Sequence, residues 1–187
     1  MLLSIYRKPM VRFVGSFIFF FLLFYYFIQI YEGITSPGGY YAPFLDHYCN
    51  FINWYRKLLL EAAHIIVNFM GYPNEVMGKY HLKLNDNISI QLVYSCLGFG
   101  LISVWFAFLL SYPSAWNKKI YWALIGFVII SILNIIRIAA LAIIVTKVKL
   151  EAISTHHTIF NVVVYIFIIL MIFFYTKEKK NKVSLSK

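Results

Sequence analysis

Long stretches without a charged side chain constrain this chain more than any other feature of its sequence. Phe13–Tyr31 contains no Asp, Glu, Lys or Arg, and three later stretches have a similar apolar character. The 19 residues of this first stretch extend about 28 Å as an α-helix, close to the roughly 30 Å hydrocarbon core of a bilayer. Hydrophobic residues make up 61% of the chain and charged residues only 13%, which is too little polar surface for a soluble domain. The sequence therefore predicts a predominantly α integral membrane protein.

We predict a single membrane domain over residues 1–187 with about four transmembrane helices. The predicted boundaries are a first span at 13–31, an outer region at 32–95, spans at 96–112, 120–145 and 157–176, and a basic tail at 177–187. A cleaved signal peptide is the competing interpretation of the first span. Its apolar run is long for a signal peptide, and no small-x-small cleavage site follows it. We therefore expect this helix to be retained.

The outer region is predicted to contain an amphipathic helix and a β-hairpin. Asp46–Met70 has helical character, but its several ionisable side chains are too many for a lipid-facing span. Tyr80–Leu84 and Ile88–Leu92 alternate apolar and polar residues on either side of the turn-forming Asn85–Asn87, which is typical of a hairpin with one apolar face. If Asp46–Met70 crossed the membrane instead, every later segment would change sides.

The charges between the apolar stretches predict the orientation. One side carries ten basic residues and a single acid, Glu178, whereas the other carries six basic and six acidic residues. Because Lys and Arg are enriched in cytoplasmic loops, both termini are predicted to be cytoplasmic. The net charge of +10 thus indicates topology, and we predict membrane lipids but no nucleic acid as partners. The ten basic residues are Arg7, Lys8, Arg12, Lys118, Lys119, Lys177, Lys179, Lys180, Lys182 and Lys187.

Three chemically distinct side chains fall at one depth, near the outer ends of the predicted spans. Cys96 lies 17 residues before the proline that ends its span, and Arg137 lies 17 residues beyond the start of its own, about 25 Å of helix in both cases. His157 precedes the first lysine of the basic tail by 20 residues, or about 30 Å. These separate counts place a thiol, a guanidinium and an imidazole at the same level.

Arg137 is the most informative of the three. Every other residue of Leu133–Val145 except Asn134 is apolar, and an unpaired cation in hydrocarbon costs about 3 kcal/mol or more. An arginine beside Cys96 would favour the nucleophilic thiolate. The competing interpretations are an ion pair with Glu61 and snorkelling of the side chain to the outer surface.

The settings of the thiol and the imidazole each allow a structural and a catalytic interpretation. Cys96 is followed two residues later by Gly98, which would let a partner backbone approach, and amides at a helix N-terminus can stabilise a thiolate. A buried cysteine can equally be a small hydrophobic residue. His156 and His157 follow two helix-capping residues, and an imidazole there can act as general acid or base near neutral pH.

A metal or haem site is the competing interpretation of the outer histidines. His47, Cys49, His64 and His81 are also predicted on the outer side, but their spacing matches no strong metal-site template. We therefore predict no cofactor and no metal. Cys49 is expected to be structural because no basic partner adjoins it in the sequence.

These elements resemble the exosortase/archaeosortase family of membrane-embedded cysteine transpeptidases. The first motif of that family is a small residue followed by Cys-Ser-Gly, and Ser95–Gly98 matches it except at Leu97. The second motif is an arginine in a late membrane helix, often with an asparagine three residues before it, as in Asn134 and Arg137.

The third motif of the family is a histidine that opens the last helix, often with a glycine four residues later. His157 matches it by position, with Asn161 where glycine is usual, and His156 remains the alternative. The order and spacing agree from about residue 70 to residue 175. The compact size and the doubled histidine are most similar to the short F-type exosortases.

The resemblance implies a sortase-like reaction on an unrelated fold. Substrates in this family carry a C-terminal sorting signal made of a short motif, a transmembrane helix and a basic tail, and the cut lies outside the membrane. The resemblance implies that Cys96 forms a thioester, that Arg137 stabilises the thiolate and the oxyanion, and that His157 protonates the leaving amine and activates an acceptor amine, such as a lipid amine. It also implies the bacterial cytoplasmic (inner) membrane, with the active site on the periplasmic side.

We therefore predict an exosortase-like cysteine protease/transpeptidase of exported proteins. Two functions from other classes stay open. In the first, the chain is a non-catalytic membrane assembly or scaffold protein, Arg137 binds Glu61 or a lipid phosphate, and Cys96 only packs. In the second, it is a metal- or haem-binding membrane protein that uses the outer histidines.

Overall fold

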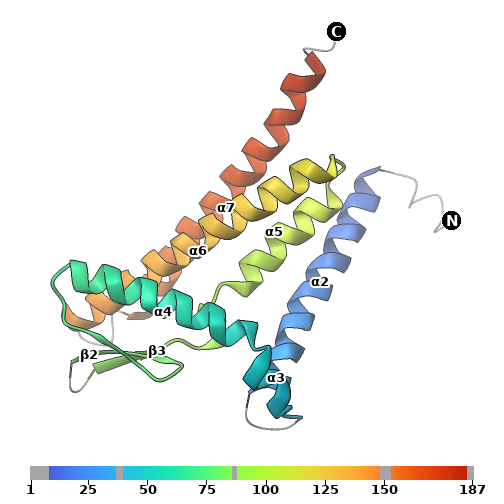
Figure 1. The fold of residues 1–187 in the computed structure, drawn as a ribbon. Helices are drawn as coiled ribbons and strands as arrows, with labels where there is room; N and C mark the ends of the chain where they lie inside the picture. The colour runs from blue at the N-terminus through green and yellow to red at the C-terminus, as the bar shows by residue number, and fades with distance from the viewer. Residues whose placement is uncertain (1–8, 37–39, 86–87, 148–152, 185–187) are drawn as a thin grey trace.

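The computed structural model describes residues 9–36, 40–85, 88–147 and 153–184. Helices α2, α5, α6 and α7 run alongside one another, α4 crosses them, and a small sheet lies at one end of this bundle (Figure 1). We call this end the sheet end. The elements in chain order are α2 (Pro9–Thr35), α3 (Pro43–Tyr48), α4 (Phe51–Phe69), β1 (Glu75–Met77), β2 (His81–Asn85), β3 (Ile88–Gln91), the 3₁₀ turn η1 (Tyr94–Cys96), α5 (Phe99–Ser111), α6 (Trp116–Lys147) and α7 (Ile153–Ser184).

Among the residues whose side chains the structure describes, two helices are long and apolar enough to cross a bilayer. These are α2 and the Trp116–Thr146 part of α6, whereas α5 and the Asn161–Lys177 part of α7 are shorter apolar helices. The apolar stretch of α2 is not buried inside the fold, as it would be in the core helix of a soluble protein. A large exposed apolar surface of this kind is typical of contact with lipid. Helix α7 also begins before and continues beyond the predicted span, from Ile153 to Ser184.

The second predicted span begins later than the sequence indicated. Residues 94–96 form the turn η1, and α5 begins only at Phe99. Gly98 separates the two with a φ of +77°, a left-handed conformation that costs residues with a side chain about 1–2 kcal/mol. The helix predicted at 96–112 is therefore corrected to 99–111, and Cys96 lies just before its N-terminus. Hydropathy did not reveal the break because the residues on both sides of it are apolar.

Residues 46–70 form two helices where the sequence predicted one. After α3 ends, Asn50 caps α4, and its side-chain oxygen accepts the backbone N–H of Asn53 at 2.9 Å. The amphipathic character is confirmed, because one face of α4 is buried and packs on α6. Helix α4 lies across the bundle and not along it (Figure 1), as expected for a partly buried helix and not for a further span. The buried face consists of Ile52, Arg56, Leu59, Leu60, Ala63 and Val67.

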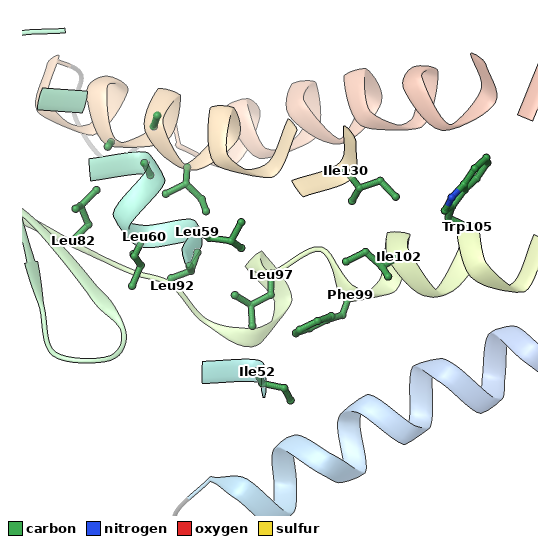
Figure 2. Packing of buried hydrophobic residues seen from close by; sticks show 14 of the residues in the cluster. Ile52, Leu59, Leu60, Leu82, Leu92, Leu97, Phe99, Ile102, Trp105 and Ile130 are labelled. Atoms are coloured by element: carbon green, nitrogen blue, oxygen red, sulfur yellow. The ribbon is translucent and has the colours of Figure 1, made fainter. Parts of the chain in front are cut away.

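The predicted hairpin is confirmed, and a third strand extends it. Strands β2 and β3 pair antiparallel with Leu82 opposite Ile90, and residues 86–87 of the predicted turn lie outside the described residues. Strand β1 pairs with the other edge of β2, with Val76 opposite Leu82. This strand has three residues, too few for alternation to reveal it. Figure 2 shows Leu82 and Leu92 beside Leu60 of α4, so the apolar face of the sheet closes the core at this end.

An aromatic cluster joins the four long helices at the opposite end of the bundle. Trp105 is fully buried, and its indole N–H donates to the carbonyl of Trp122 at 3.1 Å. Gly126 makes room for this ring, since a Cβ added there would lie 1.9 Å from the indole nitrogen. The cluster consists of Phe13 from α2, Trp105, Phe108 and Tyr112 from α5, Trp122 from α6 and Tyr175 from α7.

Candidate active site

Cys96 lies in the turn that links the sheet to α5. Its backbone N–H donates to the carbonyl of Val93 at 2.9 Å, and the N–H of Leu97 donates to the carbonyl of Tyr94 at 3.0 Å. Leu97 is fully buried and anchors the turn in the core, whereas Cys96 is a half-buried free thiol. The leucine that departs from the Cys-Ser-Gly motif thus has a packing role. Figure 2 shows it between the sheet and the start of α5.

Asn134 connects the cysteine turn to α6. Its Nδ2 donates to the carbonyl oxygen of Cys96 at 2.9 Å, and its side chain is buried. Gly98 faces the same amide, and a Cβ added there would lie 3.5 Å from Nδ2, an ordinary contact distance. Glycine is therefore required at this position by its positive φ, and not by the close approach of a partner backbone that the sequence suggested.

Cys96 and Arg137 line the same open cleft, which has a volume of about 680 Å³. They also both line a smaller cavity of about 210 Å³ that follows the chain as it leaves β3. Arg137 is half-buried and lies three residues beyond Asn134 on α6. Two of the three groups that the sequence placed at one depth are therefore together at the sheet end. The other residues that line the cleft are Phe21, Val93, Gly98, Gly100, Leu101, Val104, Asn161 and Tyr165.

Helix α7 contains both predicted histidines, but the side chains of His156 and His157 lie outside the described part of the structure. Farther along the same helix, Asn161 and Tyr165 line the cleft. His157, Asn161 and Tyr165 are spaced four residues apart, and residues at this spacing share one face of an α-helix. The choice between His157 and His156 stays open, and the role of either histidine stays a prediction.

Arg56, a buried arginine at the sheet end, is paired with Glu32 of α2. Nη2 of Arg56 lies 3.3 Å from Oε1 of Glu32, and its Nη1 lies 2.5 Å from Oδ1 of Asn53. The guanidinium also lies 4.4 Å from the centre of the Tyr80 ring. These contacts tie α2 and α4 to the segment before β2. Glu61 is exposed on α4, and the pair with Arg137 considered from the sequence has no counterpart among the ion pairs of the described residues.

The histidines and the second cysteine of the sheet end have separate surroundings. Within the described ranges, no group of three or more His, Cys, Asp or Glu side chains could hold a metal ion. Nδ1 of His64 lies 2.7 Å from Oδ1 of Asn74. Cys49 is an exposed free thiol at the end of α3, and its backbone carbonyl accepts the hydroxyl of Tyr31. These contacts give no support to a metal site.

Tyr94 is a neutral neighbour of the cysteine turn. Burial, together with the nearby charge of Glu32, raises the pKa of Tyr94 to about 12. Its ring packs on Phe99 with 5.7 Å between the ring centres. A phenol with this pKa is too weak an acid to exchange protons efficiently near neutral pH. Tyr94 therefore supports the turn by packing.

Exposed apolar helices and a cleft shared by a free thiol and an arginine define a membrane protein with a candidate site for thiol chemistry. Over residues 17–174 the chain matches the family model of the transmembrane exosortases. The chain therefore belongs to the transmembrane exosortase family, and the resemblance seen in its motifs is confirmed. Neither curated proteins nor solved structures gave a significant match. Membership of this family supports a membrane location and a transpeptidase-type role.

Proposed function

We propose that this chain is a cysteine protease and transpeptidase that cleaves C-terminal sorting signals of exported proteins at the outer face of a bacterial inner membrane. The observation that carries the proposal is that Cys96 and Arg137, from two separate elements, line the same cleft and the same smaller cavity. The transpeptidase-type role of the family supports it. The substrates would be proteins with a recognition motif, a transmembrane helix and a basic tail.

Arg137 supplies the positive charge of the proposed mechanism. A cation about 4 Å from an anion at a protein surface stabilises it by on the order of 1–4 kcal/mol. That charge favours the thiolate of Cys96 first and the oxyanion of the reacting carbonyl afterwards. Asn134 fixes the cysteine turn against α6. Its side chain donates to the Cys96 carbonyl from a position one turn before Arg137.

The proposed reaction consists of two acyl transfers. The thiolate Sγ of Cys96 attacks the scissile carbonyl carbon, and the carbonyl π electrons move to the oxygen beside Arg137. The C–N bond then breaks, the leaving nitrogen takes a proton from the imidazolium of His157, and a thioester remains. The acceptor amine gives a proton back to His157 and attacks the thioester carbon, and Sγ leaves as a thiolate. A lipid amine fits the acceptor role.

The distribution of basic residues supports an outer location for the site. Arg12, Lys118, Lys119 and Lys177 belong to the segments that meet at the aromatic cluster, and Cys96 belongs to the other end of the bundle. Basic residues concentrate on the cytoplasmic side of membrane proteins. The sheet, α4 and the cleft would then face the periplasm.

Thiol reactivity distinguishes this function from a non-catalytic scaffold. The purified protein is treated with iodoacetamide at neutral pH, and the peptides that contain Cys96 and Cys49 are quantified by mass spectrometry over time. We expect Cys96 to react faster than Cys49, although Cys49 is the more exposed thiol. Arg137→Ala should slow the reaction of Cys96 about tenfold or more, because the anion loses a nearby cation, and should leave Cys49 unchanged. Arg137→Lys should retain part of the effect.

A scaffold predicts the opposite pattern. Its Cys96 would react no faster than Cys49 and would be indifferent to Arg137→Ala. Metal analysis and the visible absorption spectrum of the same preparation test the metal- or haem-binding alternative. A stoichiometric metal or a haem band would favour that alternative over the thiol mechanism.

A further inference from the structure

The cleft at Cys96 extends away from the thiol between two helices. Helix α5 packs against α2 and α6, and α7 packs against α6. Leu101 and Val104 of α5, Phe21 of α2 and Tyr165 of α7 all line the cleft. The cleft therefore has α5 as its floor and α2 and α7 as its walls. These walls belong to segments that are predicted to span the membrane, at 13–31, 96–112 and 157–176.

Helices α2 and α7 both also contact the aromatic cluster at the opposite end of α5. Phe13 of α2 and Tyr175 of α7 both contact Phe108, with ring centres 6.2 and 5.7 Å apart. They also both contact Tyr112, at 6.4 and 5.5 Å. Both wall helices are thus fixed to the same two rings at the end of α5.

Gly100 leaves the floor of the cleft open close to the thiol. A Cβ added at Gly100 would meet no heavy atom within 4 Å, and the residue is in the first turn of α5. Its backbone is accessible from the cleft, which it lines. Small residues of this kind let a second helix approach closely in membrane proteins.

We infer that this cleft is the docking groove for the first turn of the substrate's apolar helix, and that Gly100 is the point of closest approach. The inference rests on the proposed function and names the surface that holds its substrate. A peptide in the hydrocarbon region has to be helical, because water is not available for its backbone. At Cys96, by contrast, the peptide has to be extended so that its carbonyl can be attacked. An apolar helix preceded by an extended motif satisfies both conditions.

The size of the cleft agrees with this occupant. One turn of an α-helix about 11 Å wide and about 5.4 Å tall fills roughly 500 Å³. The cleft of about 680 Å³ therefore admits the first turn and a few extended residues. The rest of the substrate helix would lie in the lipid beside the aromatic cluster, and its N-terminal end would be held next to the thiol.

Gly100→Leu tests the inference because the new side chain enters open space and fills the groove. Gly15→Leu is the matched control, since a Cβ at Gly15 also meets nothing within 4 Å and Gly15 does not line the cleft. The readout is the extent of tail removal. It is measured on the exported proteins that keep an apolar, basic-ended tail in cells with Cys96→Ala and lose it in native cells. Each variant is also treated with iodoacetamide to measure the reactivity of Cys96.

We expect Gly100→Leu to lower the rate of tail removal about tenfold or more, because the leucine side chain overlaps the space that the substrate helix would occupy. Cys96 should still be alkylated at a rate close to native. Gly15→Leu should remove tails as the native chain does. Near-native removal by Gly100→Leu would overturn the groove assignment and leave the proposed function standing. If Cys96→Ala accumulates no tails at all, the proposed function itself fails.

Crosslinking keeps the inference testable if Gly100→Leu does not reach the membrane. Benzoylphenylalanine is placed at Val104, in the groove, or at Ile132, an exposed apolar position of α6 that does not line it, each in the Cys96→Ala chain. Irradiation at Val104 should attach the same tail-bearing proteins through their apolar segment, and Ile132 should attach few. Equal capture at the two positions would contradict docking in the cleft.

Discussion

Removal of one hydrogen bond, from Asn134 to Cys96, should disturb the site more than the fold. The bond is 2.9 Å long, connects α6 to the cysteine turn, and comes from a side chain that is 5% exposed. Asn134→Leu replaces the amide with an apolar group of similar volume, so the packing is largely kept. The Cys96 carbonyl then loses its donor, and the turn is free to move relative to Arg137.

The size of the effect follows from the cost of a lost bond at a buried group, about 1–3 kcal/mol. For a chain of 187 residues this corresponds to a fall in Tm of about 2–12 °C. If the same free energy is needed to align Sγ with Arg137, tail removal should slow about 5- to 150-fold. Alkylation of Cys96 should slow as well, because the thiolate loses its fixed cation.

Ser131→Ala is the matched control for Asn134→Leu. Ser131 is on the same helix three residues earlier, is also buried, and its Oγ lies 3.0 Å from the hydroxyl of Tyr55 on α4. Its loss should lower Tm to a similar extent and leave Cys96 reactivity and tail removal near native. If Asn134→Leu behaves like Ser131→Ala in both assays, the bond does not position the thiol and the reasoning is refuted.

Three further predictions concern the turn, the core and pH. Gly98→Ala should cost about 1–2 kcal/mol, because φ there is +77°, and should lower Tm and slow Cys96 alkylation together; a native rate would show that the turn tolerates the strain. Gly126→Ala should cost about 1–3 kcal/mol or more, because the new Cβ meets the indole of Trp105 at 1.9 Å, and a shift in tryptophan fluorescence should accompany the lower Tm. The pKa of Asp46 lies below its usual 3.8, and the hydrogen bond from Asn50 is the largest cause. The ionised carboxylate therefore stabilises the fold above pH 3.8, and this contribution is lost as the pH falls through the lower pKa of the folded state. Melting temperatures at acidic pH should show this loss in the native chain and not in Asp46→Asn.

Elements that show their period in consecutive residues could be predicted from the sequence. The alternation in 80–92 predicted the hairpin, and the ionisable side chains within the helical stretch 46–70 predicted an amphipathic helix that does not span the membrane, of which 51–69 has one buried face. The third strand was missed because it consists of three residues whose pairing with β2 depends on the hairpin already being in place. The end of α3 was missed because the sequence on both sides of it is compatible with a helix.

Features that depend on docking between distant segments were not visible in the sequence. Arg56 occupies a core position on α4, and its partner Glu32 is 24 residues earlier, on α2. Nothing in the sequence pointed to Glu32 as the partner of Arg56, and Glu61, which is exposed, was considered only as a partner of Arg137. Burial of a charge is decided by the element packed against it, and hydropathy does not contain that information.

The candidate site was predicted in part. Depth counting placed Cys96 and Arg137 at one level, and both line the same cleft. The counts could not show that Asn134 bonds the Cys96 carbonyl, although a polar residue in an apolar stretch was a signal. They also could not show that Gly100 borders the cleft, because an exposed and a packed glycine look alike in a sequence. His157, with His156 as its alternative, stays a prediction.

The measurement that tests the central claim most directly is mass-spectrometric mapping of the C-terminal peptides of membrane and exported proteins. Cells with the native chain are compared with cells that carry Cys96→Ala, and Cys49→Ala serves as the control for loss of a thiol. We predict that Cys96→Ala cells accumulate proteins with an apolar, basic-ended tail that native and Cys49→Ala cells remove. The same spectra would then identify the substrates and the cut site. If the Cys96→Ala chain is present in the membrane at the native level and no C-terminus changes, the thiol does not process sorting signals and the account is contradicted.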